Sequence, residues 1–81
     1  MARVFLPEPL WPQSDGTREL QLAVEDYRDL MQALERRFPG LPAAIEREFA
    51  VVIDGDIINE PLLEAIEPNS EVHFLHRIGG G

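Results

Sequence analysis

The residues best suited to chemistry in this sequence are the three glycines at its end, Gly79, Gly80 and Gly81. Glycine has no side chain to pack and loses the most conformational freedom on ordering, so three in a row add nothing to a core. At a usual glycine frequency of about 7%, such a run arises by chance at a given position about three times in ten thousand. We therefore interpret residues 79–81 as a thin, flexible tail whose reactive group is the α-carboxylate of Gly81.

A carboxylate is a poor acyl donor and must first be activated, typically as an acyl-adenylate made with ATP and Mg²⁺. A partner would have to thread the tail into its own ATP site. Glycine suits this demand because only a backbone without β-carbons passes a narrow channel with close contact. On this interpretation Gly81 is the adenylation site and Gly79 and Gly80 are the threaded arm. The chain then needs no permanently bound cofactor, since ATP and Mg²⁺ belong to the partner.

Two histidines precede the tail, but their spacing argues against a metal site. Successive side chains of a strand point to opposite faces, so His73 and His76 cannot chelate one ion together. The same alternation places His73, Leu75 and Arg77 on one outer face. Together with Ile78, these residues form the expected partner-binding surface.

Composition excludes several classes of function. The sequence has no cysteine, which excludes disulfides, thiolate metal sites and a cysteine nucleophile. Its net charge of −8 argues against nucleic acid and anionic membranes as partners, and favours a partner with a basic groove. No catalytic triad, phosphate loop or pocketed carboxylate pair has a recognisable context, so a standalone enzyme is not expected.

The 81 residues suffice for one small domain. No apolar run approaches the roughly 20 residues of a membrane span, and the first residues lack the apolar region of a signal peptide, so the cytoplasm is the default location. All seven cationic residues are arginines. A chain without lysine offers no side-chain amine to acylate.

The elements that would position the tail follow from hydrophobic periodicity. Strands are expected over 3–7 and 17–24, joined by a proline-rich loop in which Trp11 forms a lid on the sheet edge. A helix is expected over 26–38, with Asp26 as its N-cap and an apolar stripe facing the core. Residues 41–48 are a connector with room for a helical turn.

The second half of the chain is predicted to be strands. Residues 49–53 are rich in β-formers, Asp54-Gly55 is a strong hairpin turn, and a short return strand follows. The last strand covers 71–77, with Val72 and Phe74 facing inward. One helix over a mixed sheet is an α+β arrangement, and the tail should project from the end of that sheet.

The chain resembles the ubiquitin-like sulfur carriers, the MoaD/ThiS family, over almost its whole length. The segment "FAVVIDGDIINEPLLEAIEPNSEVHFLHRIGGG" is similar to the C-terminal half of that family. The Gly tail with the strand before it is the most specific part of this resemblance. The helix of the family is similar to "LMQALERRFPGL". The long first hairpin of molybdopterin-synthase small subunits and cysteine-synthesis carriers resembles "VFLPEPLWPQSDGTRELQL".

This resemblance implies a β-grasp domain over 1–78, with one main helix packed on one face of the sheet, followed by the tail. It also implies a cycle in which a ubiquitin-activating-type enzyme adenylates Gly81 and a sulfur donor converts it to a thiocarboxylate. The sulfur then passes to a synthase, with molybdopterin synthesis the first assignment and a partner similar to the molybdopterin synthase large subunit. His76, Arg77 and Ile78 stand where the family often has proline and small residues.

Two other functions fit the same residues. The chain could be a ubiquitin-like modifier conjugated through Gly81 to target amines. It could also be a non-covalent β-grasp interaction module whose tail is incidental.

Overall fold

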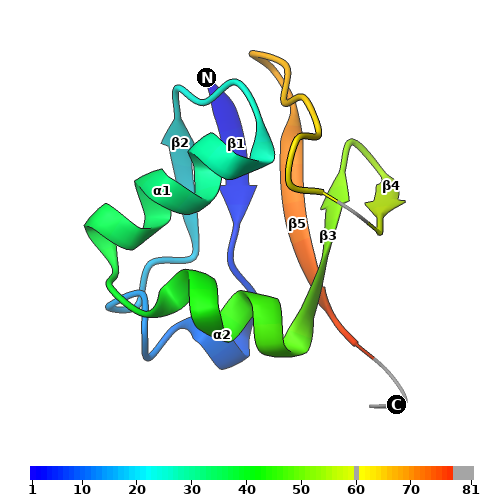
Figure 1. The fold of residues 1–81 in the computed structure, drawn as a ribbon. Coiled ribbons are helices and arrows are strands. Elements are labelled where there is room, and N and C mark those ends of the chain that lie inside the picture. Colours follow the sequence, from blue (N-terminus) through cyan, green and yellow to red (C-terminus); the bar gives the residue numbers. More distant parts are fainter. Residues whose placement is uncertain (60, 78–81) are drawn as a thin grey trace.

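The computed structural model describes residues 1–59 and 61–77, so Ile78 and the predicted tail, residues 79–81, lie outside the described part (Figure 1). The elements in chain order are β1 (Ala2–Phe5), η1 (Glu8–Leu10), β2 (Glu19–Leu22), α1 (Tyr27–Arg37), α2 (Leu41–Glu48), β3 (Phe49–Ile53), β4 (Asp56–Ile58) and β5 (Glu71–His76). No helix within this part is long and apolar enough to cross a membrane.

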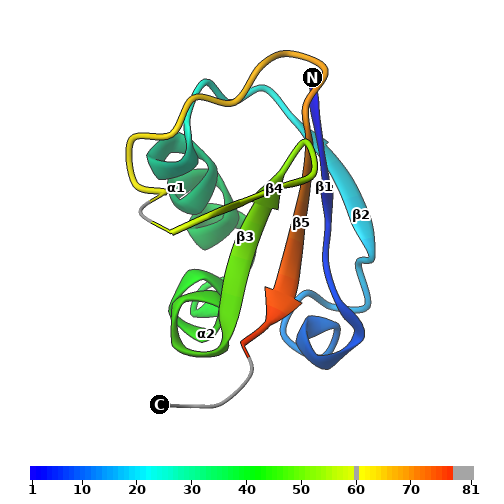
Figure 2. The same cartoon turned by 90° about the vertical axis from the view of Figure 1, so that its right-hand side faces the viewer.

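Over the described residues the strands form one five-stranded mixed sheet in the order β2-β1-β5-β3-β4. β1 and β5 are parallel neighbours at its centre, whereas the other neighbouring pairs are antiparallel. Both helices lie on one face, and the other face is open (Figure 2). This arrangement confirms the predicted α+β β-grasp fold.

The main helix, α1, forms where the apolar spacing predicts it. The carboxylate of Asp26 accepts a hydrogen bond from the Asp29 backbone N–H at 2.7 Å and so caps the first turn. Leu30 and Leu34 are fully buried, and Tyr27 and Met31 pack beside them half-buried. The stripe therefore does bury against the sheet, as its period requires.

Residues 41–48 are a complete second helix rather than a connector with a single turn. Leu41, Ala44 and Ile45 are buried at the i, i+3, i+4 spacing of a helix. Gly40 precedes them with φ 92°, in the left-handed region that favours glycine, and lets the chain turn out of α1. Pro42 looks like a helix breaker in the sequence, but a proline in the first turn removes no helical hydrogen bond.

Trp11 has the lid position predicted for it. Its indole N–H donates to the Leu6 carbonyl oxygen at 2.7 Å, and its ring packs against the core. The guanidinium of Arg18 lies 4.4 Å from the ring centroid. The indole therefore has its hydrogen bond satisfied within the domain and covers the β1–β2 side of the sheet.

Candidate docking surfaces at the end of strand β5

The open face of the sheet carries a connected group of apolar side chains around β5. Val72 and Phe74 are buried beneath the helices, so the alternation of β5 places His73 and Leu75 on the open face. His73 lies opposite Val52, and Leu75 opposite Ala50. We call this group the open-face patch, and its members are Phe5, Ala50, Val52, Ile57, His73 and Leu75.

Two members of the open-face patch are strongly exposed. Leu75 is 51% exposed and Ile57 is 60% exposed. A single exposed leucine is ordinary, but here it adjoins other apolar side chains on the neighbouring strands. Neighbouring exposed apolar side chains of this kind make the open-face patch a candidate interaction surface.

His73 lies in the middle of the open-face patch, between Phe5 on β1 and Val52 on β3, and it has charged neighbours. Its ring stacks on Phe5 with centroids 4.4 Å apart and planes 6° from parallel. Its Nε2 lies 3.5 Å from Oε1 of Glu71, and Glu71 also pairs with Arg3 on β1. The imidazole is therefore fixed between the Phe5 ring and the Glu71 carboxylate on the open face, where a partner could contact it.

His76 has different surroundings. Its Nε2 lies 3.5 Å from Oε1 of Glu48, at the end of α2, and its ring meets Phe49 edge-on at 5.1 Å. The two histidines thus contact separate carboxylates. Residues 1–59 and 61–77 contain no group of three or more His, Cys, Asp or Glu side chains placed to hold a metal ion.

Arg77 departs from the predicted alternation. β5 ends at His76, and the Arg77 backbone N–H donates to the carbonyl oxygen of Glu48 at 2.8 Å. Its Nε–H donates to the carbonyl oxygen of Phe49 at 3.1 Å. These bonds to the α2–β3 junction turn the side chain away from His73 and Leu75, so the three do not share one face. A partner contact of Arg77 stays a prediction, and Ile78 lies outside the described residues.

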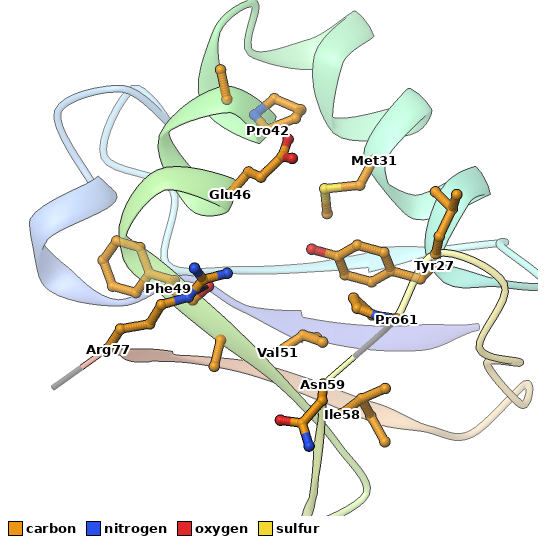
Figure 3. A pocket seen from close by; sticks show the side chains of 13 residues that line it. Tyr27, Met31, Pro42, Glu46, Phe49, Val51, Ile58, Asn59, Pro61 and Arg77 are labelled. Carbon is orange, nitrogen blue, oxygen red and sulfur yellow. Dashed lines mark hydrogen bonds between the residues drawn. The ribbon is translucent and has the colours of Figure 1, made fainter. Parts of the chain in front are cut away.

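The Arg77 side chain instead lines a pocket of about 740 Å³ between α1, α2, β3 and β4 (Figure 3). Most of the lining is apolar, and the segment Pro61–Leu62 closes one side. The apolar stripe of α1 is predicted to face the core along its whole length, but at Tyr27 and Met31 it lines this pocket, which the sequence did not predict. A signal existed: Tyr27 and Met31 are four residues apart on α1, as Pro42 and Glu46 are on α2, so each pair lies on one face of its helix.

The pocket lining includes four polar side chains, Tyr27, Glu46, Asn59 and Arg77, and the first of these is influenced by both charged ones. Figure 3 shows the Tyr27 hydroxyl directed toward the side where Glu46 and Arg77 lie. Burial, reinforced by the Glu46 carboxylate and opposed by the Arg77 guanidinium, raises the pKa of Tyr27 to about 12. Both charged groups therefore act on one point inside the pocket.

The start of β5 is tied to the β3–β4 turn by side-chain hydrogen bonds. Asp54 accepts from the Ser70 hydroxyl at 2.7 Å and from the Glu71 backbone N–H at 2.9 Å. The Ser70 hydroxyl oxygen in turn accepts from the Glu67 backbone N–H at 3.0 Å. The backbone bond from Glu71, followed by that from Ser70, holds the pKa of Asp54 below its usual value.

No family model matches this sequence, and none of the curated proteins does. The fold, however, matches solved structures over essentially the full length of both chains. A chain of the Amycolatopsis orientalis BexX/CysO complex matches with a TM-score of 0.87 at 16% identity, covering 100% of each chain. Mycobacterium tuberculosis CysO matches with a TM-score of 0.85 at 16% identity, covering 96% of this chain and 100% of the other.

A third match is the small archaeal modifier protein 1 of Methanosarcina acetivorans. Its TM-score is 0.79 at 25% identity, and the match covers 99% of this chain and 95% of the other. The resemblance to the ubiquitin-like sulfur carriers is thus confirmed as a likeness of fold, and the described residues form a ubiquitin-like β-grasp domain.

Proposed function

We propose that this protein is a sulfur carrier that acts as a co-substrate rather than as an enzyme. In the proposed cycle a carboxylate oxygen of Gly81 attacks the α-phosphorus of ATP on an activating enzyme, and pyrophosphate leaves. Hydrosulfide from the sulfur donor then attacks the carbonyl carbon of this acyl-adenylate, AMP leaves, and a thiocarboxylate remains on Gly81. A synthase takes this sulfur into a biosynthetic product. Molybdopterin synthesis is the first acceptor pathway to test and cysteine synthesis the second, because the long first hairpin resembles that of both kinds of carrier.

The observation that carries this proposal is the position of the open-face patch beside the root of the tail. Leu75 lies two residues before Arg77, after which the chain leads into Ile78 and the three glycines. An apolar surface at this point can hold a partner while that partner engages the terminus. The match to a chain of the BexX/CysO complex supports a protein of this fold acting together with a second protein.

The proposal is tested by the intact mass of the protein after incubation with host lysate, ATP, Mg²⁺ and a sulfur source. We expect a mass gain equal to the replacement of one oxygen by one sulfur. A chain lacking Gly81 should show no gain, and a known carrier added to the same lysate shows that the lysate is competent. An unchanged mass in a competent lysate would contradict the proposal.

A second candidate function is protein modification through Gly81. The match to a small archaeal modifier protein favours it. The sequence has no lysine, so the chain could not form polymers linked through its own side chains. This function predicts adducts of higher mass in cells that disappear when Gly80 and Gly81 are deleted. A non-covalent module would instead keep its partner after this deletion.

A further inference from the structure

The end of β5, from which the chain leads into the tail, borders two surfaces. One is the open-face patch, which the proposed function assigns to a partner. The other is the pocket between α1, α2, β3 and β4, on the helix side of the sheet. We propose that this pocket is a second docking point for the activating enzyme. It would take an apolar side chain of that enzyme, next to a cationic side chain that pairs with Glu46. This inference rests on the proposed function.

The first argument is geometric. A channel that encloses the tail must surround the point where the tail leaves the domain, so the enzyme meets the domain on more than one side of that point. Arg77 is the last described residue, and its side chain lines the pocket. Phe49, whose carbonyl oxygen holds the Arg77 Nε–H at 3.1 Å, lines it as well. An enzyme that threads the tail therefore comes to lie over the pocket.

The second argument is the chemistry of the lining. Its apolar part comes from Met31, Val51, Ile58 and Leu62, and Leu62 is 60% exposed at the rim. Methionine is unbranched and polarisable, so it adapts to an inserted side chain. A cavity of about 740 Å³ has room for such a side chain. An apolar core with a polar rim is the usual anatomy of a protein interface.

The third argument is charge complementarity. Glu46 is an exposed lining residue, and among the ion pairs of the described residues none involves it. Arg77, the other charged group of the lining, is already bound to a backbone carbonyl. The carboxylate is therefore open to a cation from outside. The net charge of −8 makes a basic partner surface the favoured counterpart.

Two substitutions test the pocket without disturbing the core. Ala43 is an exposed lining residue of α2, so Ala43→Trp fills the mouth of the pocket with a bulky ring. Glu46→Arg reverses the charge that would bind the cation. The control is Glu67→Arg, an equal charge reversal at an exposed site near the start of β5. Thermal unfolding checks that all three variants fold. If Ala43→Trp does not fold, Glu46→Arg alone tests the pocket.

The readout is ATP–pyrophosphate exchange by the host's adenylating enzyme, with the carrier as the varied substrate. We expect Ala43→Trp and Glu46→Arg to raise the KM for the carrier at least tenfold with kcat unchanged, because docking contacts bind ground state and transition state alike. Glu67→Arg should behave as wild type.

Wild-type KM values for both pocket variants would overturn the pocket proposal alone. An effect of the two variants on later sulfur transfer alone would also overturn it, because the pocket would then bind the synthase. Loss of a self-associated form in the variants would overturn it too, because the pocket would then bind a second copy of this chain. No exchange with the wild-type chain would instead overturn the proposed function, and the pocket proposal with it.

Discussion

The two ends of strand β5 are built in opposite ways. At the start, Ser70 is 2% exposed, and its hydroxyl and the Glu71 backbone N–H both bond to the carboxylate of Asp54. At the other end, Leu75 is 51% exposed and the strand finishes beside a pocket. One end uses its polar groups to hold the fold together, whereas the other leaves apolar and charged groups open to a partner.

The difference separates stability from function along a single strand. Changes at the start of β5 should alter the free energy of unfolding and leave partner binding intact. Changes at its end should do the reverse, since exposed side chains contribute little to stability.

The largest expected effect comes from Leu75→Glu. A carboxylate at the exposed end of the open-face patch would have to be buried in the complex without a cation to pair with, so we expect partner affinity to fall at least tenfold, or about 1.4 kcal/mol. The free energy of unfolding should change by less than about 0.5 kcal/mol. Titration calorimetry with the activating enzyme and urea unfolding measure the two quantities.

The control for this substitution is Leu63→Glu. Leu63 is 74% exposed and belongs neither to the open-face patch nor to the pocket lining. Its change should leave affinity unaltered. Equal losses from both substitutions would show that added negative charge, and not the patch, is responsible.

Ser70→Ala should produce the next largest effect, at the opposite end of the strand. The change removes the hydroxyl that donates to Asp54 and leaves the Glu67 backbone N–H without its acceptor. We expect the free energy of unfolding to fall by about 1–2 kcal/mol, by urea titration followed through Trp11 fluorescence. Partner affinity should stay at the wild-type value, and a matched loss of affinity would break the separation between the two ends.

A smaller effect is expected from Asp54→Asn, which should change how the stability of the domain depends on pH in acid. The folded pKa of Asp54 is lowered from 3.8, so its stabilising contribution is present above that pH and is lost as the pH falls through the lower folded value. The melting temperature of the variant should therefore fall less steeply than that of wild type below pH 3.8. Asparagine tolerates the positive φ of 50° at this position, so the backbone should be preserved. Parallel curves for the two proteins would contradict the assignment.

The smallest expected change is a shift in the titration of Tyr27. This shift tests whether Glu46 and Arg77 both act on its hydroxyl inside the pocket. The sequence has a single tyrosine, so phenolate absorbance reports on it alone. Its folded pKa of about 12 lies above the ordinary 10.0, so the corresponding stability is lost as the pH rises between these values. Glu46→Gln should lower this pKa and Arg77→Gln should raise it. Glu67→Gln is the control, and the absence of a shift in both pocket variants would place the two charges elsewhere.

The parts of the fold that could be predicted are those with a local signal. A run of β-forming residues ended by the Asp54-Gly55 turn predicted the bounds of β3, and the Asp26 cap and the apolar stripe located α1. His73 and Leu75 lie on the open face because a period of two within one strand suffices to place them.

The features that were missed depend on approach between distant segments. The pocket exists because α2 packs beside α1 over the sheet. The turn of Arg77 depends on carbonyl groups 28 and 29 residues earlier, at Phe49 and Glu48. The bond between Asp54 and Ser70 likewise spans 16 residues. Periodicity within one element carries no information about such contacts.

The parallel pairing of β1 and β5 also determines how the domain would respond to a mechanical load. β1 begins at one end of the sheet, and β5 ends at the opposite end (Figure 1). A pull on the tail, opposed at the beginning of the chain, slides these two central strands past each other. The hydrogen bonds between them then share the force instead of opening one after another. The domain should thus resist extension along the direction in which a partner draws on its tail.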